Sequence, residues 1–196
     1  VSKVPYWESE YAVAGGLAGE PMELVDCETV DIQVPANAEI VIEGTLTQER
    51  HPEGPFGEFT GYMGDMSHSP RFQISCITHR AEPIYQAFQG QMPPSESRVI
   101  QKIGNEKSIL RYLQNSRIKD IRDVALHEES ASMQFLVIQL DKMNDAEPWQ
   151  AMRAASGYTP SEGRFTVAVD TDIDPHDLGS VIWAMSYRVQ PHRDVE

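Results

Sequence analysis

The hydrophobic pattern of this chain changes near residue 92, and this change limits the folds that the chain can adopt. Before residue 92, apolar residues fall into extended runs with no helical segment between them. After it, segments of helical period alternate with short apolar runs. Successive strands form an antiparallel sheet or barrel, whereas alternating strands and helices form an α/β layer. We therefore expect an α+β protein with a strand-rich first part and an α/β second part, divided near residues 91–115.

The first part opens with a segment at 4–18 that predicts a short helix, or a strand that ends at Gly15-Gly16. Mostly alternating or apolar runs then predict strands at 22–35, 38–46, 70–80 and 83–88. Alternation along the third of these runs places four side chains on one face: Phe72, Ile74, Cys76 and Thr78.

The second part begins with a helix that starts near Ser95, a residue type suited to the N-cap. Its apolar period continues to residue 113, although Gly104-Asn105 could break it into two helices. Strands are predicted at 118–126, 133–140 and 165–169, and helices at 148–155 and 177–187. Asp174 before Pro175 is the expected cap of the last helix, whose inward residues are Val181, Ile182, Ala184 and Met185.

Charge and composition narrow the classes of partner. The 196 residues carry a formal net charge of −14, which argues against nucleic acid or an anionic membrane surface, because phosphate binding requires clustered Lys and Arg. We expect no membrane partner, since no apolar run approaches membrane-spanning length. Cys27 and Cys76 share no spacing motif, so reduced thiols in a cytoplasmic protein are expected. The chain starts at Val1 in mid-pattern, without a signal peptide, so we expect the natural N-terminus to lie upstream.

Two glutamates flank a cluster of glycine, proline and aromatic residues at 53–62. Regular strand spacing would put Glu53 and Glu58 on opposite faces. However, Gly54-Pro55 breaks the strand, and Gly57 can adopt backbone dihedral angles that other residues avoid. A looped backbone could therefore turn both carboxylates into one dry pocket, where one would stay protonated and act as a proton donor. The alternatives are a surface turn with two solvated glutamates, and a glycosidase carboxylate pair with Phe56, Phe59 and Tyr62 as stacking rings.

Two other groups of polar residues resemble metal sites only superficially. The three histidines near this cluster share no ligand spacing: His51, His68 and His79. Asp170, Asp172 and Asp174 resemble the start of a calcium loop, but the required glycine and terminal glutamate are missing. We interpret the aspartates as a loop that ends one strand and leads into the next helix.

Several longer motifs, taken together and in order, resemble one family. In the first half they are 9–15 (SEYAVAG), 34–44 (VPANAEIVIEG) and 52–62 (PEGPFGEFTGY). Later segments agree, at 77–80, 83–85, 169–174, 181–185 and 193–194. They resemble the UbiD family of reversible aromatic and acrylic acid decarboxylases over nearly the whole chain.

This resemblance implies a fold and a domain organisation. Residues 1–92 would be the latter part of a flavin-binding split β-barrel, 93–115 a linker helix region, and 116–196 a C-terminal α/β domain that is incomplete. In this family the C-terminal domain often forms the dimer, so the resemblance also implies a homo-oligomer.

The resemblance further implies a reaction and its cofactors. The reaction is the non-oxidative, reversible decarboxylation of an aromatic or α,β-unsaturated carboxylic acid. The cofactor is prenylated FMN, supplied by a flavin prenyltransferase and held through its phosphate by Mn²⁺ or Mg²⁺ and by K⁺. Carried over residue by residue, Glu58 matches the proton-donating acid, Glu53 its partner in an ionic network, and Glu10 a ligand of the metal that bridges the cofactor phosphate.

This chain departs from the family pattern in what it lacks. The family's Asn and His metal ligands, and the Arg that pairs with the two glutamates, match no position here; Arg50 and Arg80 match other positions. The second hypothesis is therefore a truncated or non-catalytic subunit that folds and oligomerises without holding flavin.

Overall fold

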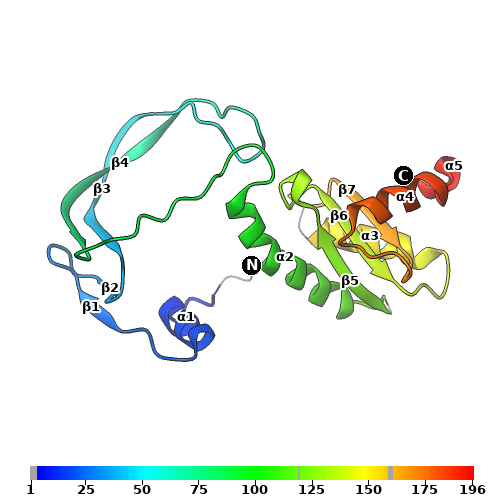
Figure 1. The fold of residues 1–196 in the computed structure, drawn as a ribbon, viewed down its shortest axis with the longest axis horizontal. Helices are drawn as coiled ribbons and strands as arrows, with labels where there is room; N and C mark the ends of the chain where they lie inside the picture. The colour runs from blue at the N-terminus through cyan, green and yellow to red at the C-terminus, as the bar shows by residue number, and fades with distance from the viewer. Residues whose placement is uncertain (1–3, 119, 159–160) are drawn as a thin grey trace. The chain divides into compact units, whose positions relative to one another are not determined.

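The structure is a computed structural model that describes residues 4–118, 120–158 and 161–196. Its described residues form two compact units. The strand unit comprises residues 4–56 and 63–88, and the α/β unit comprises residues 57–62 and 89–196. Figure 1 labels the elements of both.

A three-stranded mixed sheet forms the centre of the α/β unit. Its strands are β5 (Ile121–Leu126), β6 (Phe135–Leu140) and β7 (Phe165–Val169), in that order. β5 runs antiparallel to β6, and β6 runs parallel to β7. A parallel pair needs a crossover connection, and the chain between β6 and β7 contains α3 (Ala146–Tyr158) (Figure 1).

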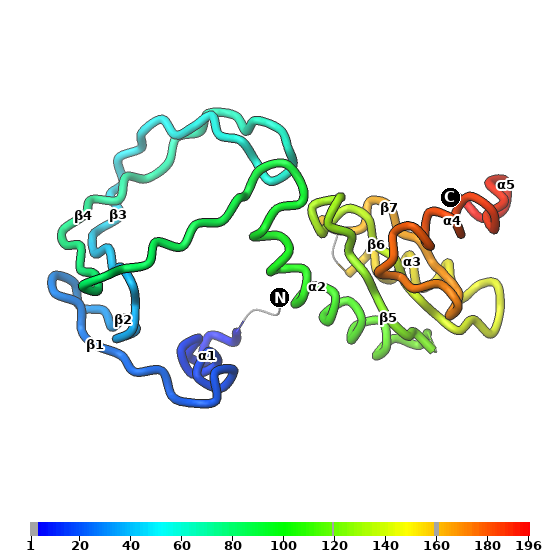
Figure 2. Tube along the Cα trace, viewed as in Figure 1, coloured from blue at the N-terminus to red at the C-terminus, as the bar shows by residue number. Residues whose placement is uncertain are grey.

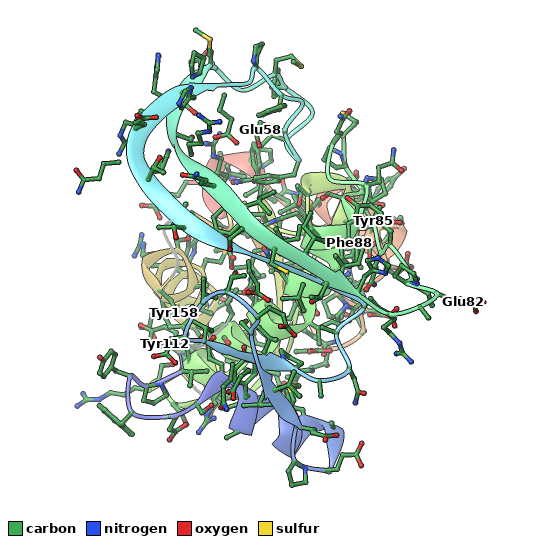
Figure 3. The ribbon with its side chains drawn as sticks, turned by 90° about the vertical axis from the view of Figure 1, so that its left-hand side faces the viewer. Glu58, Glu82, Tyr85, Phe88, Tyr112 and Tyr158 are labelled. Atoms are coloured by element: carbon green, nitrogen blue, oxygen red, sulfur yellow. The ribbon has the colours of Figure 1, made fainter. Side chains whose placement is uncertain are left out.

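Helices cover both faces of this sheet, because successive apolar side chains of its strands point to opposite faces and are buried on both. The first face packs on α2 (Glu96–Gln114) and α3 through residues that include Ile109, Leu113, Leu126, Leu136, Ile138, Ala151 and Ala155. The second face packs on α4 (Leu178–Tyr187) through residues that include Ala125, Val137, Val169, Val181 and Ala184. Tyr112 of α2 also stacks on Tyr158 of α3, with ring centroids 4.3 Å apart (Figure 3). The unit is therefore a three-layer helix–sheet–helix arrangement.

The helices of this unit confirm part of the sequence prediction and correct the rest. α2 continues through Gly104-Asn105 without a break, and Ser95 stands at its N-cap but makes no side-chain capping bond. Asp177, not Asp174, caps α4: its Oδ1 accepts a hydrogen bond from the Gly179 N–H at 3.0 Å. A 3-10 turn, η1 (Glu128–Ser130), and a short helix, α5 (Pro191–Asp194), also belong to the unit.

Only two of the four residues predicted to face inward from α4 are buried. Val181 and Ala184 are buried, but the side chains of Ile182 and Met185 are 48% and 36% exposed. Positions 181 and 184 are three residues apart and face the sheet, whereas 182 and 185 lie about 100° further round the helix. The apolar stripe of α4 is therefore wider than the face that the sheet covers.

The strand unit contains one helix and two separate pairs of strands. α1 (Glu10–Ala18) precedes β1 (Leu24–Asp26) and β2 (Gln33–Pro35), which pair antiparallel. The long strands β3 (Ile40–Glu53) and β4 (Ser67–His79) form the second antiparallel pair, and Figure 2 traces them side by side. The single strand predicted at 22–35 is thus two strands joined by a loop, and the predicted strand at 83–88 is irregular chain.

A β-bulge in β4 changes which side chains share a face. Glu43 lies opposite Cys76 and Gly44 opposite Ile74, so Ser75 is an extra residue. The alternation shifts by one position there. The prediction that Ile74 and Cys76 lie on one face was therefore wrong, because it assumed unbroken alternation.

One face of the β3–β4 pair is apolar and exposed. Its residues, which we call the open face, are Ile40, Ile42, Leu46, Phe72, Ile74 and Ile77, each at least 36% exposed. Among the described residues of the strand unit, only Gly15 and Glu43 are buried. Both apolar core clusters of the described chain belong to the α/β unit. None of the helices within the described ranges is long and apolar enough to cross a membrane.

Candidate functional site

Glu58 stands on a tight turn that belongs to the α/β unit. The Glu58 N–H donates to the Tyr62 carbonyl at 2.8 Å, and the Gly61 N–H donates to the Glu58 carbonyl at 2.9 Å. Gly61 has a φ of +86°, a backbone conformation that favours glycine. The Glu58 side chain itself is exposed. The turn thus fixes the backbone of Glu58 and leaves its carboxylate open to a ligand.

Glu53 is the last residue of β3, in the strand unit, and its side chain is also exposed. The predicted break at Gly54-Pro55 is confirmed: the strand ends at Glu53, and Gly54 has a φ of +91°. The Gly64 N–H then donates to the Phe56 carbonyl at 2.8 Å. The two glutamates of the motif therefore belong to different units, on either side of this break.

Glu10 is the first residue of α1, and its side chain is exposed. Beside this helix lies a shallow hollow of about 630 Å³ that is largely open to solvent. Its lining is mostly apolar and rich in small residues, and it comprises Ser9, Tyr11, Ala12, Gly15, Gly16, Gly19, Glu20, Pro21, Met22 and Leu24. Glu10 is not among these lining residues. Its exposed carboxylate offers an oxygen ligand of the type that a hard cation prefers.

The described residues do not contain a complete set of metal ligands. Within 4–118, 120–158 and 161–196, no group of three or more His, Cys, Asp or Glu side chains could hold a metal ion. Asp172, of the calcium-like segment, instead forms a bidentate ion pair with Arg188, at 2.9 and 2.6 Å. A metal at Glu10 would therefore need further ligands from a cofactor, from water or from other chain segments.

Sequence reasoning missed a buried carboxylate, Glu43, which organises the strand unit. Its side chain is 3% exposed and accepts hydrogen bonds from the Glu28 N–H at 2.9 Å and from the Thr29 N–H and hydroxyl, both at 2.7 Å. The Thr29 hydroxyl also contacts the Ser75 hydroxyl at 2.6 Å. These bonds, the one from Glu28 first, lower the pKa of Glu43. An acidic residue in phase with Val41, within an apolar strand, was the available signal.

The environment of the two cysteines follows from the same contacts. Cys27 and Cys76 are free thiols and half-buried. Burial, followed by the nearby Glu43 carboxylate, raises the pKa of the Cys27 thiol. A raised pKa lowers the fraction of Cys27 that is present as thiolate, which is the nucleophilic form.

Two family models together cover nearly the whole chain. Residues 1–92 match the Rift-related domain of 3-octaprenyl-4-hydroxybenzoate carboxy-lyase, called UbiD, and residues 98–196 match the C-terminal domain of the same enzyme. A relative from Synechocystis, an uncharacterised protein, is 36% identical over 98% of this chain and 38% of its own length.

Solved structures agree with the family models. The UbiD-class enzyme HmfF from Pelotomaculum thermopropionicum, an evolved dimeric form in complex with prFMN, has a TM-score of 0.88 and 34% identity over 98% of this chain and 44% of its own. Vanillic acid decarboxylase from Sedimentibacter hydroxybenzoicus, in open form, has a TM-score of 0.84 and 28% identity over 98% of this chain and 42% of its own. The mixed α+β fold thus matches UbiD-class structures, and the chain spans about two fifths of the length of these relatives.

Proposed function

The chain belongs to the UbiD family, and on that premise we propose that its intact protein is a prenylated-FMN-dependent decarboxylase. Its reaction would be the non-oxidative, reversible decarboxylation of an aromatic or α,β-unsaturated carboxylic acid. The observation that carries this proposal is the likeness to HmfF in complex with prFMN, at a TM-score of 0.88 over 98% of this chain.

We propose Glu58 as the general acid. When bound, the prenylated flavin would supply an electron sink for the electron pair that is released when the carbon–carboxylate bond breaks. Glu58 would hold a proton on its carboxyl group and deliver it to the carbon that has lost CO₂. The turn supports this role because it anchors the backbone of Glu58 while its side chain is exposed. Substrate, cofactor and the remainder of the protein would have to exclude water around it.

Glu53 and Glu10 would serve the same reaction without transferring the proton. Glu53 is the proposed partner of Glu58 in the ionic network that orients the acid. Glu10 would bind Mn²⁺ or Mg²⁺, which with K⁺ would hold the cofactor phosphate. The exposed carboxylate of Glu10 at the start of α1 supports that assignment.

We propose that the strand unit is the latter part of a split β-barrel. Its open face leaves apolar side chains such as Ile42, Phe72 and Ile74 in water, which costs free energy in an isolated pair of strands. The matched relatives are more than twice as long as this chain, so further segments of the flavin-binding domain would cover that face. This arrangement would also bring the missing metal ligands.

We also infer a homo-oligomer in solution and a flavin prenyltransferase as the supplier of the cofactor. The dimeric form of HmfF supports the first inference. The second follows from the proposed cofactor, because a prenylated flavin must be made by prenyl transfer to FMN.

The alternative is a non-catalytic form that folds and oligomerises without flavin. The observation that favours it is that no group of three or more His, Cys, Asp or Glu side chains within the described residues could hold a metal ion. The two functions differ in whether the intact protein retains flavin.

The deciding experiment is to produce the intact protein together with a flavin prenyltransferase and to record its visible absorption spectrum and intact mass. The sample is then incubated with hydroxybenzoate-like, cinnamate-like and heteroaromatic acids, and CO₂ release is measured. Flavin absorbance with turnover of at least one acid supports the decarboxylase. A flavin-free protein that releases no CO₂ supports the non-catalytic form.

A further inference from the structure

The turn that carries Glu58 is held by the chain segment that leads into α2. A Cβ atom added at Gly57 would lie 2.9 Å from the Cδ of Gln91, and one at Gly61 would lie 2.5 Å from the Sδ of Met92. Both distances are shorter than a side chain allows, so the 91–92 segment packs directly on the turn. The turn and α2 accordingly belong to the same compact unit.

Arg98, in the first turns of α2, makes the third contact with this turn. Its guanidinium carbon lies 4.9 Å from the ring centroid of Phe59, the residue next to Glu58. This is cation–π geometry, and such a contact strengthens as the pair leaves water. Arg98 and Phe59 are both half-buried.

The guanidinium of Arg98 is itself held on its other edges. Its Nε donates to the Ala131 carbonyl at 3.3 Å, and its Nη1 donates to the Gln101 side chain. Its Nη2 atom is buried and has no hydrogen-bond partner among the described residues. Arg98 is therefore anchored on α2 and on the β5–β6 connection, and it presents one face to Phe59.

We propose that Arg98 is a positioning residue for the general acid. It holds the ring of Phe59 against the start of α2, and through the adjacent peptide bond it fixes the direction in which Glu58 leaves the turn. This inference rests on the proposed role of Glu58 for its catalytic consequence, but not for the contact itself. A fixed backbone beside a free carboxylate is what a proton donor requires to meet one carbon of a bound substrate.

The test measures amide hydrogen exchange by mass spectrometry on the intact protein and on its Arg98→Ala variant. Residues 57–62 contain two reporter amides, Glu58 N–H and Gly61 N–H, whose bonds close the turn. Loss of the cation–π contact is expected to accelerate their exchange by about fivefold or more, since local opening sets the rate.

A matched control is Arg153→Ala, because Arg153 lies over the ring of Trp149 at 5.9 Å in the same unit. This control removes a similar contact and is expected to leave exchange in 57–62 unchanged. Arg98→Lys keeps the charge and is expected to restore part of the protection. Phe59→Leu keeps an apolar side chain without the ring face, and it is expected to reproduce the effect of Arg98→Ala.

Kinetics of the loaded protein then test the catalytic consequence. Arg98→Ala is expected to lower kcat with little change in KM, since substrate still binds but meets a less well directed acid. Unchanged exchange in 57–62, or equal acceleration in Arg98→Ala and Arg153→Ala, would overturn the positioning role. Accelerated exchange with an unchanged kcat would also overturn it. A wild-type protein that loads flavin but releases no CO₂ would contradict the proposed function, while the exchange data would still decide whether Arg98 holds the turn.

Discussion

Glu43 and Cys76 lie opposite each other on β3 and β4, and the β-bulge at Ser75 brings a third side chain to the same face. The buried Glu43 carboxylate binds the 28–29 backbone, while Ser75 contacts the hydroxyl of Thr29. These contacts attach the loop between β1 and β2 to the long strand pair. In a unit with few buried residues, this polar anchor takes the place of an apolar core.

The first prediction concerns Glu43 and pH. Its folded-state pKa is lowered, so its ionisation stabilises the fold at pH values above the unfolded pKa of about 4.3. That stabilisation is lost as pH falls through the lower folded-state pKa. Glu43→Gln should therefore reduce the melting temperature at pH 7 and should flatten its dependence on pH below about 5.

Thermal unfolding of the intact protein, followed by circular dichroism across this pH range, measures both effects. Glu49→Gln is the matched control, because Glu49 lies on the same strand and its side chain is exposed. Equal melting curves for the two variants would count against the anchoring role of Glu43.

The second prediction concerns the face of α2 that packs on the sheet. Leu113 is fully buried, whereas Ile103 on the same helix is 68% exposed. Leu113→Ala should lower the free energy of unfolding by about 2–5 kcal/mol. Ile103→Ala should change it by only about 0.5 kcal/mol. Urea unfolding of both variants checks this, and similar losses would mean that α2 packs differently.

The third prediction concerns Glu10 as a metal ligand. Glu10→Ala should lower the content of bound Mn²⁺ or Mg²⁺ and of flavin, because one hard oxygen ligand is lost. Metal analysis and the flavin-to-protein absorbance ratio measure the two quantities. Glu8→Ala removes an exposed carboxylate two residues away and should retain both. Full metal and flavin occupancy in Glu10→Ala would remove Glu10 from the metal site.

Local pattern predicted most of the α/β unit. The strand at 165–169 was confirmed residue for residue. A five-residue apolar run between polar segments is too short for a typical helix and favours a buried strand. The glycine within α2 did not divide the helix, since Ile109 and Leu113 bury completely on the sheet and outweigh its low propensity.

The strand unit was harder to predict, for two physical reasons. A bulge such as the one at Ser75 depends on partners across the sheet, so it leaves no mark in the alternation itself. The 83–88 run has strand-like composition but no partner strand among the described residues. A strand needs hydrogen bonds to a neighbouring strand, which composition alone does not supply.

The candidate site divides in the same way. The break in the strand before Glu58 could be predicted, because glycine and proline disfavour a continuous strand. The strand ends at the predicted position. The contact between the turn at Glu58 and α2 could not be predicted from the sequence. Phe59 and Arg98 are almost forty positions apart, and a cation–π pair leaves no periodic signature.

The role of Glu58 as the general acid is tested by comparing the intact, flavin-loaded protein with its Glu58→Gln variant, using an acid that the wild-type protein decarboxylates. The variant keeps the shape of the side chain but has no carboxyl proton to donate. We predict equal flavin absorbance in the two proteins and a loss of CO₂ release of about 10²- to 10⁴-fold in the variant. Turnover at the wild-type rate with flavin bound would contradict the account, because the proton would then come from another group.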